Sequence, residues 1–79
     1  MIAFDGAAVR RLREAKGLSL EQLTRRMTKR LGRGITKAAI SSWERGLCCP
    51  GQAHLCAMSE ALGVDDMNVF FSRRQNHGA

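Results

Sequence analysis

One spacing recurs four times in this chain and constrains its fold more than any other feature. Each time, an apolar residue is followed at once by Asp, Ser or Thr, and a second apolar residue stands five positions after the first. This is a hydrophobic staple around an N-cap residue, which fixes how a chain enters a helix. The four sets are Phe4–Asp5–Val9, Leu18–Ser19–Leu23, Ile35–Thr36–Ile40 and Val64–Asp65–Val69. The pattern predicts four helix starts, the second completed by Gln22 as a capping box.

Glycines mark the predicted helix ends. Each follows a segment of helical periodicity, at the position where a left-handed residue closes a helix. These glycines are Gly17, Gly32, Gly46 and Gly63. With a further start at Pro50 and Gly51, helices are predicted at 6–16, 20–31, 37–45, 51–62 and 66–71. No segment alternates as a strand does, so we predict an all-α, compact five-helix bundle over residues 1–71 and a polar, frayed tail over 72–79.

The apolar periodicity assigns one face of each helix to a single core. The predicted core residues are Val9, Leu12, Leu20, Leu23, Met27, Leu31, Ile40, Trp43, Leu55, Met58, Ser59, Leu62, Val69 and Phe70. No apolar run approaches the roughly 18 residues of a membrane span. The first nine residues lack the basic cluster of a secretory signal. We therefore expect a cytoplasmic protein that does not enter a membrane.

The net charge of +6 is concentrated in one segment. Seven basic residues and one acid, Glu44, lie between positions 25 and 45, and the rest of the chain is neutral. A concentrated basic patch indicates a polyanionic partner, either nucleic acid or an anionic membrane, although a solvated helix face has the same composition. A membrane surface fits less well, because no bulky apolar face lies opposite the basic residues.

The predicted helix 37–45 has an outward face suited to a DNA groove. Ile40 and Trp43 hold it to the core, and its outward residues are all small, hydroxylated or basic. They are Lys37, Ala38, Ser41, Ser42 and Arg45. A helix that enters the major groove needs such a face, because its side chains must reach base edges and phosphates. An ordinary exposed helix without bulky residues would have the same composition.

Three segments carry a family resemblance: "LREAKGLSLEQL" at 12–23, "ITKAAISSWERG" at 35–46 and "ALGVDDMNVFF" at 61–71. They resemble the helix-turn-helix domain of the Cro-repressor type, also called the xenobiotic-response-element (XRE) type, and the likeness runs from about Asp5 to Phe71. The resemblance implies a lambda-repressor-like fold in which helix 37–45 is the recognition helix. It also implies a transcriptional regulator that binds double-stranded DNA sequence-specifically without a cofactor. We expect it to be a repressor.

The resemblance also assigns roles to single residues. Lys37, Ala38 and Ser42 are placed at base edges, with Ser41 on the same outward face. Arg45 and the loop after Gly46 are placed at the phosphate backbone. The expected phosphate contacts are Arg33, Thr36, Arg45, Leu47 and Cys48. Arg13 is expected to pair with Glu44 as an orienting contact rather than to touch DNA.

Two departures from the family pattern affect these expectations. Members have glutamine after the "LS" cap, where it contacts phosphate, whereas this chain has Leu20. Only backbone N–H groups at that helix start are then left for phosphate. The connection to the recognition helix is also longer, through one more helical turn and a loop around residues 28–34. Its basic residues Lys29, Arg30 and Arg33 are expected either to grip flanking phosphates or to cover an outer surface.

The stretch "GLCCPGQAHLC" at 46–56 raises the alternative of a metal or thiol-responsive site. Zinc sites favour two ligand pairs with short spacings, whereas His54 and Cys56 diverge on a helix. We predict no metal site and expect Cys56 to act as a small hydrophobe. A redox response through Cys48 or Cys49 stays open, because a basic loop can lower a thiol pKa.

We do not expect an enzyme, because the chain has no sequence-evident nucleophile pair and little room for a pocket beside its core. A protein-interaction module, such as an antitoxin or a complex subunit, remains an alternative, with the basic segment facing an acidic partner. A single recognition helix reads few base pairs, so a homodimer on a palindromic site is expected. Its interface is predicted at helix 66–71, with either Phe70 or Phe71 facing outward.

Overall fold

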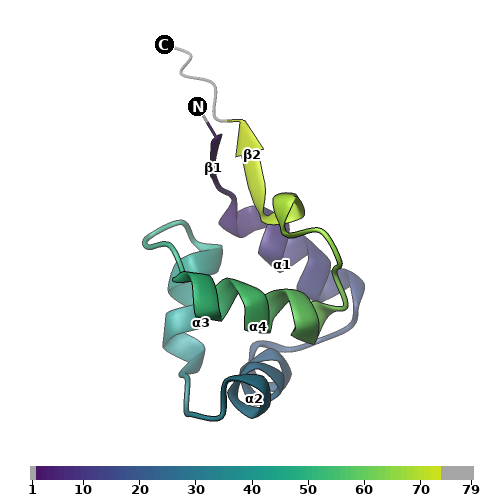
Figure 1. Ribbon diagram of the computed structural model, residues 1–79, viewed down its shortest axis with the longest axis vertical. Coiled ribbons are helices and arrows are strands. Elements are labelled where there is room, and N and C mark those ends of the chain that lie inside the picture. The colour runs from purple at the N-terminus through teal and green to yellow at the C-terminus, as the bar shows by residue number, and fades with distance from the viewer. Residues whose placement is uncertain (1, 74–79) are drawn as a thin grey trace.

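The computed structural model describes residues 2–73, which form four α-helices, one 3-10 helix and a two-stranded sheet (Figure 1). In chain order the elements are β1 (Ile2–Phe4), α1 (Gly6–Ala15), α2 (Leu20–Leu31), α3 (Lys37–Glu44), α4 (Gln52–Leu62), the 3-10 helix η1 (Met67–Phe70) and β2 (Phe71–Arg73). The four α-helices predicted at 6–16, 20–31, 37–45 and 51–62 are confirmed to within one residue at each end.

The helix starts and ends follow the predicted chemistry. The side chains of Asp5, Ser19 and Thr36 each accept a hydrogen bond from a backbone N–H three residues later. Gln22 completes the capping box by accepting from the N–H of Ser19 at 2.9 Å. All four glycine stops lie in the left-handed region, at φ between 69° and 76°. Local sequence therefore determines where α1, α2 and α3 begin and where all four helices end, whereas α4 begins at Gly51 without a side-chain cap.

The prediction of a fifth α-helix at 66–71 is wrong. The segment forms one 3-10 turn, capped by Asp66 rather than Asp65, and continues into β2. β2 pairs antiparallel with β1, with Ile2 opposite Arg73 and Phe4 opposite Phe71. Strands of three residues are too short for an alternating pattern to reveal them. Ser72 and Arg73, assigned to the polar tail, therefore belong to β2, and residues 74–79 lie outside the described part of the chain.

The core lies where α1 to α4 meet η1. Ten of the predicted core residues are buried, and Leu12, Leu20 and Leu31 are half-buried against the cluster. The ten are Val9, Leu23, Met27, Ile40, Trp43, Leu55, Met58, Ser59, Leu62 and Phe70. The prediction for Val69 is wrong, because its side chain is 43% exposed. With three residues per turn, a 3-10 helix directs Met67 and Phe70 to the same side and turns Val69 outward.

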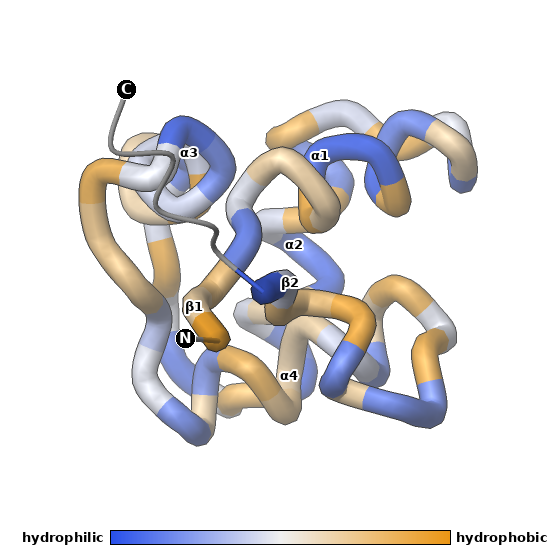
Figure 2. Tube along the Cα trace, turned by 90° about the horizontal axis from the view of Figure 1, so that it is seen from above, coloured by the Kyte–Doolittle hydropathy of each residue, from blue (hydrophilic) through white to orange (hydrophobic). Residues whose placement is uncertain are grey.

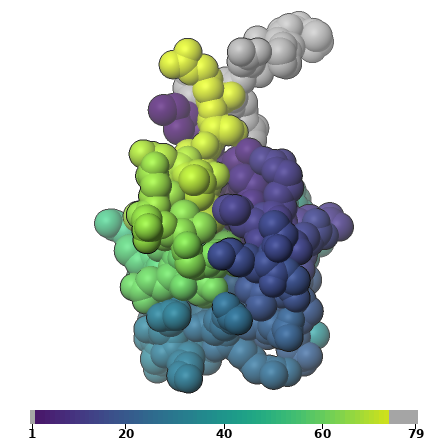
Figure 3. Space-filling view, turned by 90° about the vertical axis from the view of Figure 1, so that its right-hand side faces the viewer, coloured from purple at the N-terminus to yellow at the C-terminus, as the bar shows by residue number. Residues whose placement is uncertain are grey.

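The packing leaves α3 at one side of the molecule. α1 and α2 both contact α3, α2 also packs along α4, and η1 contacts α1 and α4. Seen from above, α3 lies away from α4, with the β1–β2 ribbon in front of the centre (Figure 2). Figure 3 shows the face opposite α3, where α1, α2 and the segment from α4 to η1 form a closed surface. The long side of α3 that faces away from the core is therefore left on the outside.

Candidate nucleic-acid interface

The outward residues of α3 form one continuous surface. Ile40 is fully buried and Trp43 is 6% exposed, and these two side chains attach α3 to the core. Lys37, Ala38 and Arg45 are exposed, and Ser41 and Ser42 are half-buried. At 100° per residue, these five residues fall within an arc of about 140° around the helix axis. We define them as the α3 outer face: Lys37, Ala38, Ser41, Ser42 and Arg45.

An ion pair with α1 turns the acidic residue of α3 away from this face. Arg13 donates to Glu44 through Nε at 2.7 Å and through Nη2 at 3.1 Å. The two side chains are only 11% and 5% exposed. The hydrogen bond to Glu44 raises the pKa of Arg13 above its ordinary value against the opposing effect of burial. Arg13 therefore keeps its charge at any pH where the protein is folded, and it neutralises Glu44 beside the α3 outer face.

The same guanidinium also reaches the segment before α2. Its Nη1 donates to the carbonyl oxygen of Leu18 at 2.8 Å. Three elements are thus joined at one side chain: α1, the entry to α2, and the C-terminal turn of α3. Such an arrangement fixes the orientation of the two helices of the helix-turn-helix unit relative to α1, which is the role the resemblance gives to this pair.

The C-terminal turn of α3 also packs directly on the first turn of α1. A Cβ added at Gly6 would overlap the carbonyl oxygen of Trp43 and lie 2.8 Å from that of Glu44. The end of α3 is closed by a Schellman motif, in which Leu47 N–H donates to Ser42 O at 2.9 Å and Gly46 N–H donates to Trp43 O at 3.1 Å. Sequence reasoning missed the role of Gly6, since no spacing or neighbouring residue marks it as a contact point.

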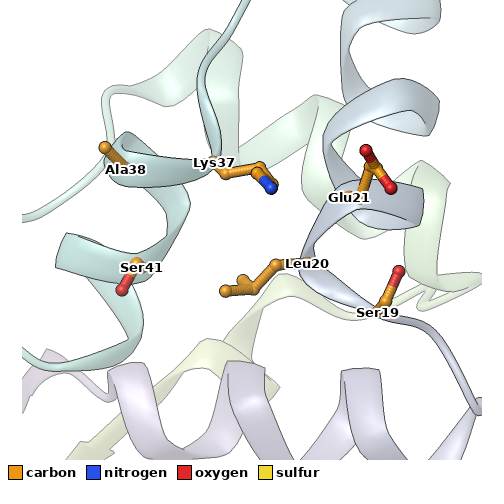
Figure 4. Close-up of a pocket in the computed structure, with 6 residues that line it drawn as sticks. All are labelled: Ser19, Leu20, Glu21, Lys37, Ala38 and Ser41. Atoms are coloured by element: carbon orange, nitrogen blue, oxygen red, sulfur yellow. The ribbon is translucent and has the colours of Figure 1, made fainter.

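The N-terminal half of α3 borders an open hollow of about 520 Å³. Figure 4 shows its lining: Ser19, Leu20 and Glu21 from the start of α2, and Lys37, Ala38 and Ser41 from α3. Leu20 extends from α2 toward α3, and Lys37 extends from α3 toward α2. Within residues 2–73, Lys37 has no carboxylate within 4 Å. The hollow thus joins three residues of the α3 outer face to the first turn of α2.

Part of the basic segment on α2 turns away from α3. Arg30 pairs with Glu60 of α4 at 3.4 Å, and Arg26 donates to the carbonyl oxygen of Ala61 at 3.2 Å. Arg25 pairs with Glu21 at 3.5 Å on α2 itself. The longer connection is formed as expected, since α2 continues to Leu31 and residues 32–36 form the loop. Of its three basic residues, Arg30 faces α4, whereas Lys29 and Arg33 are exposed without a carboxylate within 4 Å in the described chain.

The loop after α3 is exposed next to the β1–β2 ribbon. Leu47 is 65% exposed, and Cys48 and Cys49 are free, exposed thiols. Together with Gly46 and with Ala3 and Phe4 of β1, the two cysteines line a hollow of about 320 Å³. Of the predicted phosphate contacts, Arg33, Thr36, Arg45, Leu47 and Cys48 are all solvent-exposed.

The expectation for Cys56 is wrong, because its side chain is exposed rather than part of the core. The buried stripe of α4 runs through Leu55, Met58, Ser59 and Leu62, and position 56 lies beside this stripe. His54 packs its ring against Trp43, with centroids 5.2 Å apart. Across the part of the chain that the structure describes, no three His, Cys, Asp or Glu side chains gather closely enough to hold a metal ion.

None of the described helices is long and apolar enough to span a membrane.

Comparison with known proteins agrees with the geometry of α2 and α3. A family model described as "Helix-turn-helix" matches residues 9–66, which include α2, α3, α4 and most of α1. No curated protein and no solved structure matches the chain. Because the family match covers well over half of its residues, this protein belongs to the XRE-type helix-turn-helix family of DNA-binding regulators.

Proposed function

We propose that this protein is a transcriptional repressor that recognises a specific double-stranded DNA sequence by placing α3 in the major groove. The observation that supports this most directly is the composition of the α3 outer face, which carries two cations, two hydroxyls and one methyl group. The acid of the helix is held inward by Arg13. A duplex can therefore approach α3 without meeting a carboxylate or a bulky side chain on that face.

The residues divide by the groups they would meet. Lys37, Ala38, Ser41 and Ser42 are proposed to face base edges, where Lys donates to guanine and small side chains allow close approach. Both ends of α3 are proposed to meet phosphate, through Arg33 and Thr36 before the helix and through Arg45, Leu47 and Cys48 after it. Leu47 and Cys48 would contribute their backbone, because neither side chain is a strong donor.

The deciding experiment is selection of duplexes from a random library by the full chain, followed by affinity measurement at physiological salt. A single enriched sequence, bound far more tightly than random DNA, is the expected result. An even distribution over the library would contradict the proposal and would favour the protein-interaction alternative.

Lys37→Ala tests the proposed base contact. On the selected duplex we expect a loss of about 1–3 kcal/mol, confined to discrimination at one base position. Competition binding against duplexes that vary at each position measures this. An equal loss of affinity on selected and random DNA would show that Lys37 contacts phosphate instead.

Arg45→Ala tests the proposed phosphate contact. Affinity should fall for all sequences alike, and the slope of log affinity against log salt should become less steep by about one unit. Titrations between about 50 and 200 mM salt measure the slope. Lys16→Ala is the matched control, because this exposed cation at the end of α1 lies beside Gly63, outside the α3 outer face, and its slope should not change. An unchanged slope in Arg45→Ala would remove Arg45 from the interface.

Repression is tested by transcription in vitro from a promoter that carries the selected sequence. We expect transcript to fall as the site fills, because a protein bound across a promoter blocks polymerase. Transcript that rises with occupancy would assign activation instead.

We also propose that the protein binds DNA as a homodimer through the η1 and ribbon region. The expected outward phenylalanine is not present: Phe70 is fully buried, and Phe71 is half-buried in edge contact with Phe4. The exposed apolar residues there are Ile2, at 70%, and Val69, at 43%. Sedimentation should show a dimer that Val69→Asp weakens. A monomer at all concentrations up to about 100 μM would contradict this proposal.

A further inference from the structure

The hollow beside α3 has an apolar residue of α2 in its lining. This residue is Leu20, at the first position of α2, and it lines the hollow with Lys37, Ala38 and Ser41. A duplex that meets these three α3 residues also comes against Leu20. Whatever part of the DNA lies in the hollow is thus presented with a branched apolar side chain.

The side chain of Leu20 is only partly buried by its packing against the core. Its side chain is half-buried against the core cluster, and the remainder lines the hollow. The helix start does not require an apolar residue there, because the capping box of Ser19 and Gln22 already supplies the local hydrogen bonds. Exposed apolar surface at the centre of a polar, cationic interface is a candidate for contact with an apolar group of the ligand.

Charge and hydrogen bonding make the hollow a poor site for phosphate. Two N–H groups at the start of α2, those of Ser19 and Gln22, are occupied by the capping box. Glu21, the next residue of the helix, places a carboxylate at the rim, where it pairs with Arg25. Because this pair is 3.5 Å apart and the Glu21 side chain is 61% exposed, the carboxylate is only loosely paired and still disfavours a phosphate at this helix start.

A base edge suits the hollow better than phosphate does. In the major groove the only apolar group is the C5-methyl of thymine, which stands beside the O4 acceptor, and 5-methylcytosine carries the same methyl. Leu20 and the methyl of Ala38 offer an apolar surface, and Lys37, which has no carboxylate within 4 Å in residues 2–73, offers a donor next to it. The apolar surface therefore complements the C5-methyl of either base, whereas the Lys37 donor complements thymine alone, because cytosine carries an N4–H2 donor in place of O4.

We infer that Leu20 is a specificity-determining residue that contacts the C5-methyl group of a pyrimidine in the major groove. The inference rests on the proposed function, and it makes the first turn of α2 a base-reading element in addition to α3. The contact buries about one methyl group, which corresponds to a three- to five-fold effect on affinity.

The test uses the full chain and the duplex that it selects. Each thymine is replaced in turn by deoxyuridine, which removes only the methyl group. We expect a three- to five-fold loss at one position in each half-site. Cytosine at that position should bind more weakly, and 5-methylcytosine should regain the methyl contribution. If the affinity for the 5-methylcytosine duplex equals or exceeds that for the thymine duplex, the preferred base at this position is methylated cytosine.

Variants of Leu20 test whether this residue causes the difference in affinity between thymine and deoxyuridine. In Leu20→Ala the ratio between thymine and deoxyuridine at that position should fall to about one, whereas Leu20→Met should retain most of it. Leu31→Ala is the matched control, because Leu31 is a half-buried leucine at the other end of α2, away from the hollow. Circular dichroism establishes folding, and Leu20→Val replaces Leu20→Ala if the latter does not fold.

The outcomes separate the inference from the function on which it rests. If the protein selects no duplex, the proposed function fails. If it selects a duplex but tolerates deoxyuridine at every thymine, the inference alone is overturned. A methyl effect that persists unchanged in Leu20→Ala also overturns it, because another residue must then make the contact.

Discussion

At its C-terminal end α3 packs on Gly6 and is joined through Glu44 to Arg13, whereas its N-terminal end borders the open hollow at Lys37 and Leu20. The first end is attached by a close backbone approach and an almost buried ion pair. The second is attached by the cap at Thr36 and by Ile40 one turn later. One helix thus combines a fixed end with an accessible end.

The difference shows how so short a helix can serve for recognition. An isolated helix of eight residues is unstable in water, so its structure depends on tertiary contacts. The inward side chains of Ile40, Trp43 and Glu44 make these contacts, so the outward side chains at the N-terminal end are free to meet a ligand. Substitutions of the inward residues at the fixed end should therefore affect folding, and those of the outward residues of α3 should affect binding.

The largest effect is expected from removing Arg13. Arg13→Ala leaves Glu44 almost buried without its partner, which should lower the free energy of unfolding by about 3–5 kcal/mol. Urea denaturation measures the loss. The double variant Arg13→Met with Glu44→Leu should recover much of it, because no unpaired charge remains. If Arg13→Ala were as stable as the unaltered protein, the fixed end of α3 would not depend on this pair.

Gly6→Ala should have the next largest effect. The new methyl group overlaps the carbonyl oxygen of Trp43, so α1 and α3 must separate, at about 2–3 kcal/mol of stability. The control is Gly34→Ala, where a Cβ meets nothing within 4 Å and stability should change by at most about 1 kcal/mol. Thermal unfolding compares the two variants. Equal melting temperatures would show that the close approach at Gly6 is not maintained in solution.

The smallest of these effects is expected at the open end. Thr36→Ala removes the side-chain acceptor for Ala39 N–H, a bond of 3.1 Å, and should lower stability by about 1 kcal/mol. Thr36→Ser keeps the acceptor and should be close to neutral. DNA affinity should also fall in Thr36→Ala, because Thr36 is a proposed phosphate contact as well as the cap of α3. A loss in stability as large as that of Gly6→Ala would remove the distinction between the two ends.

Local signals were sufficient for most of the fold. Caps at Asp5, Ser19 and Thr36 and glycines at the helix ends act over three to six residues, so they can be identified in a single sequence. The segment from Asp65 to Arg73 could not be predicted in the same way. Its staple pattern indicates a helix. The segment instead forms one 3-10 turn and then a strand, because it pairs with Ile2–Phe4 at the other end of the described chain.

The candidate site also contains features that the sequence predicts and features that depend on tertiary packing. The outward residues of α3 follow from helical periodicity, and the Arg13–Glu44 pair follows from the family resemblance. Gly6 and the hollow beside Leu20 depend on how α1 and α2 are placed against α3, and nothing near either residue in the sequence encodes that placement. The prediction for Cys56 is wrong for a related reason, because one residue along α4 separates the buried Leu55 from the exposed Cys56.

The guanidinium of Arg13 donates both to Leu18, just before α2, and to Glu44, at the end of α3. The two reading helices are thus spaced by a side chain that belongs to neither of them. Transplanting residues 19–48 alone into another scaffold would carry every proposed DNA contact but leave Arg13 behind. A chimera that inherits the operator preference of this protein must therefore include α1 as well.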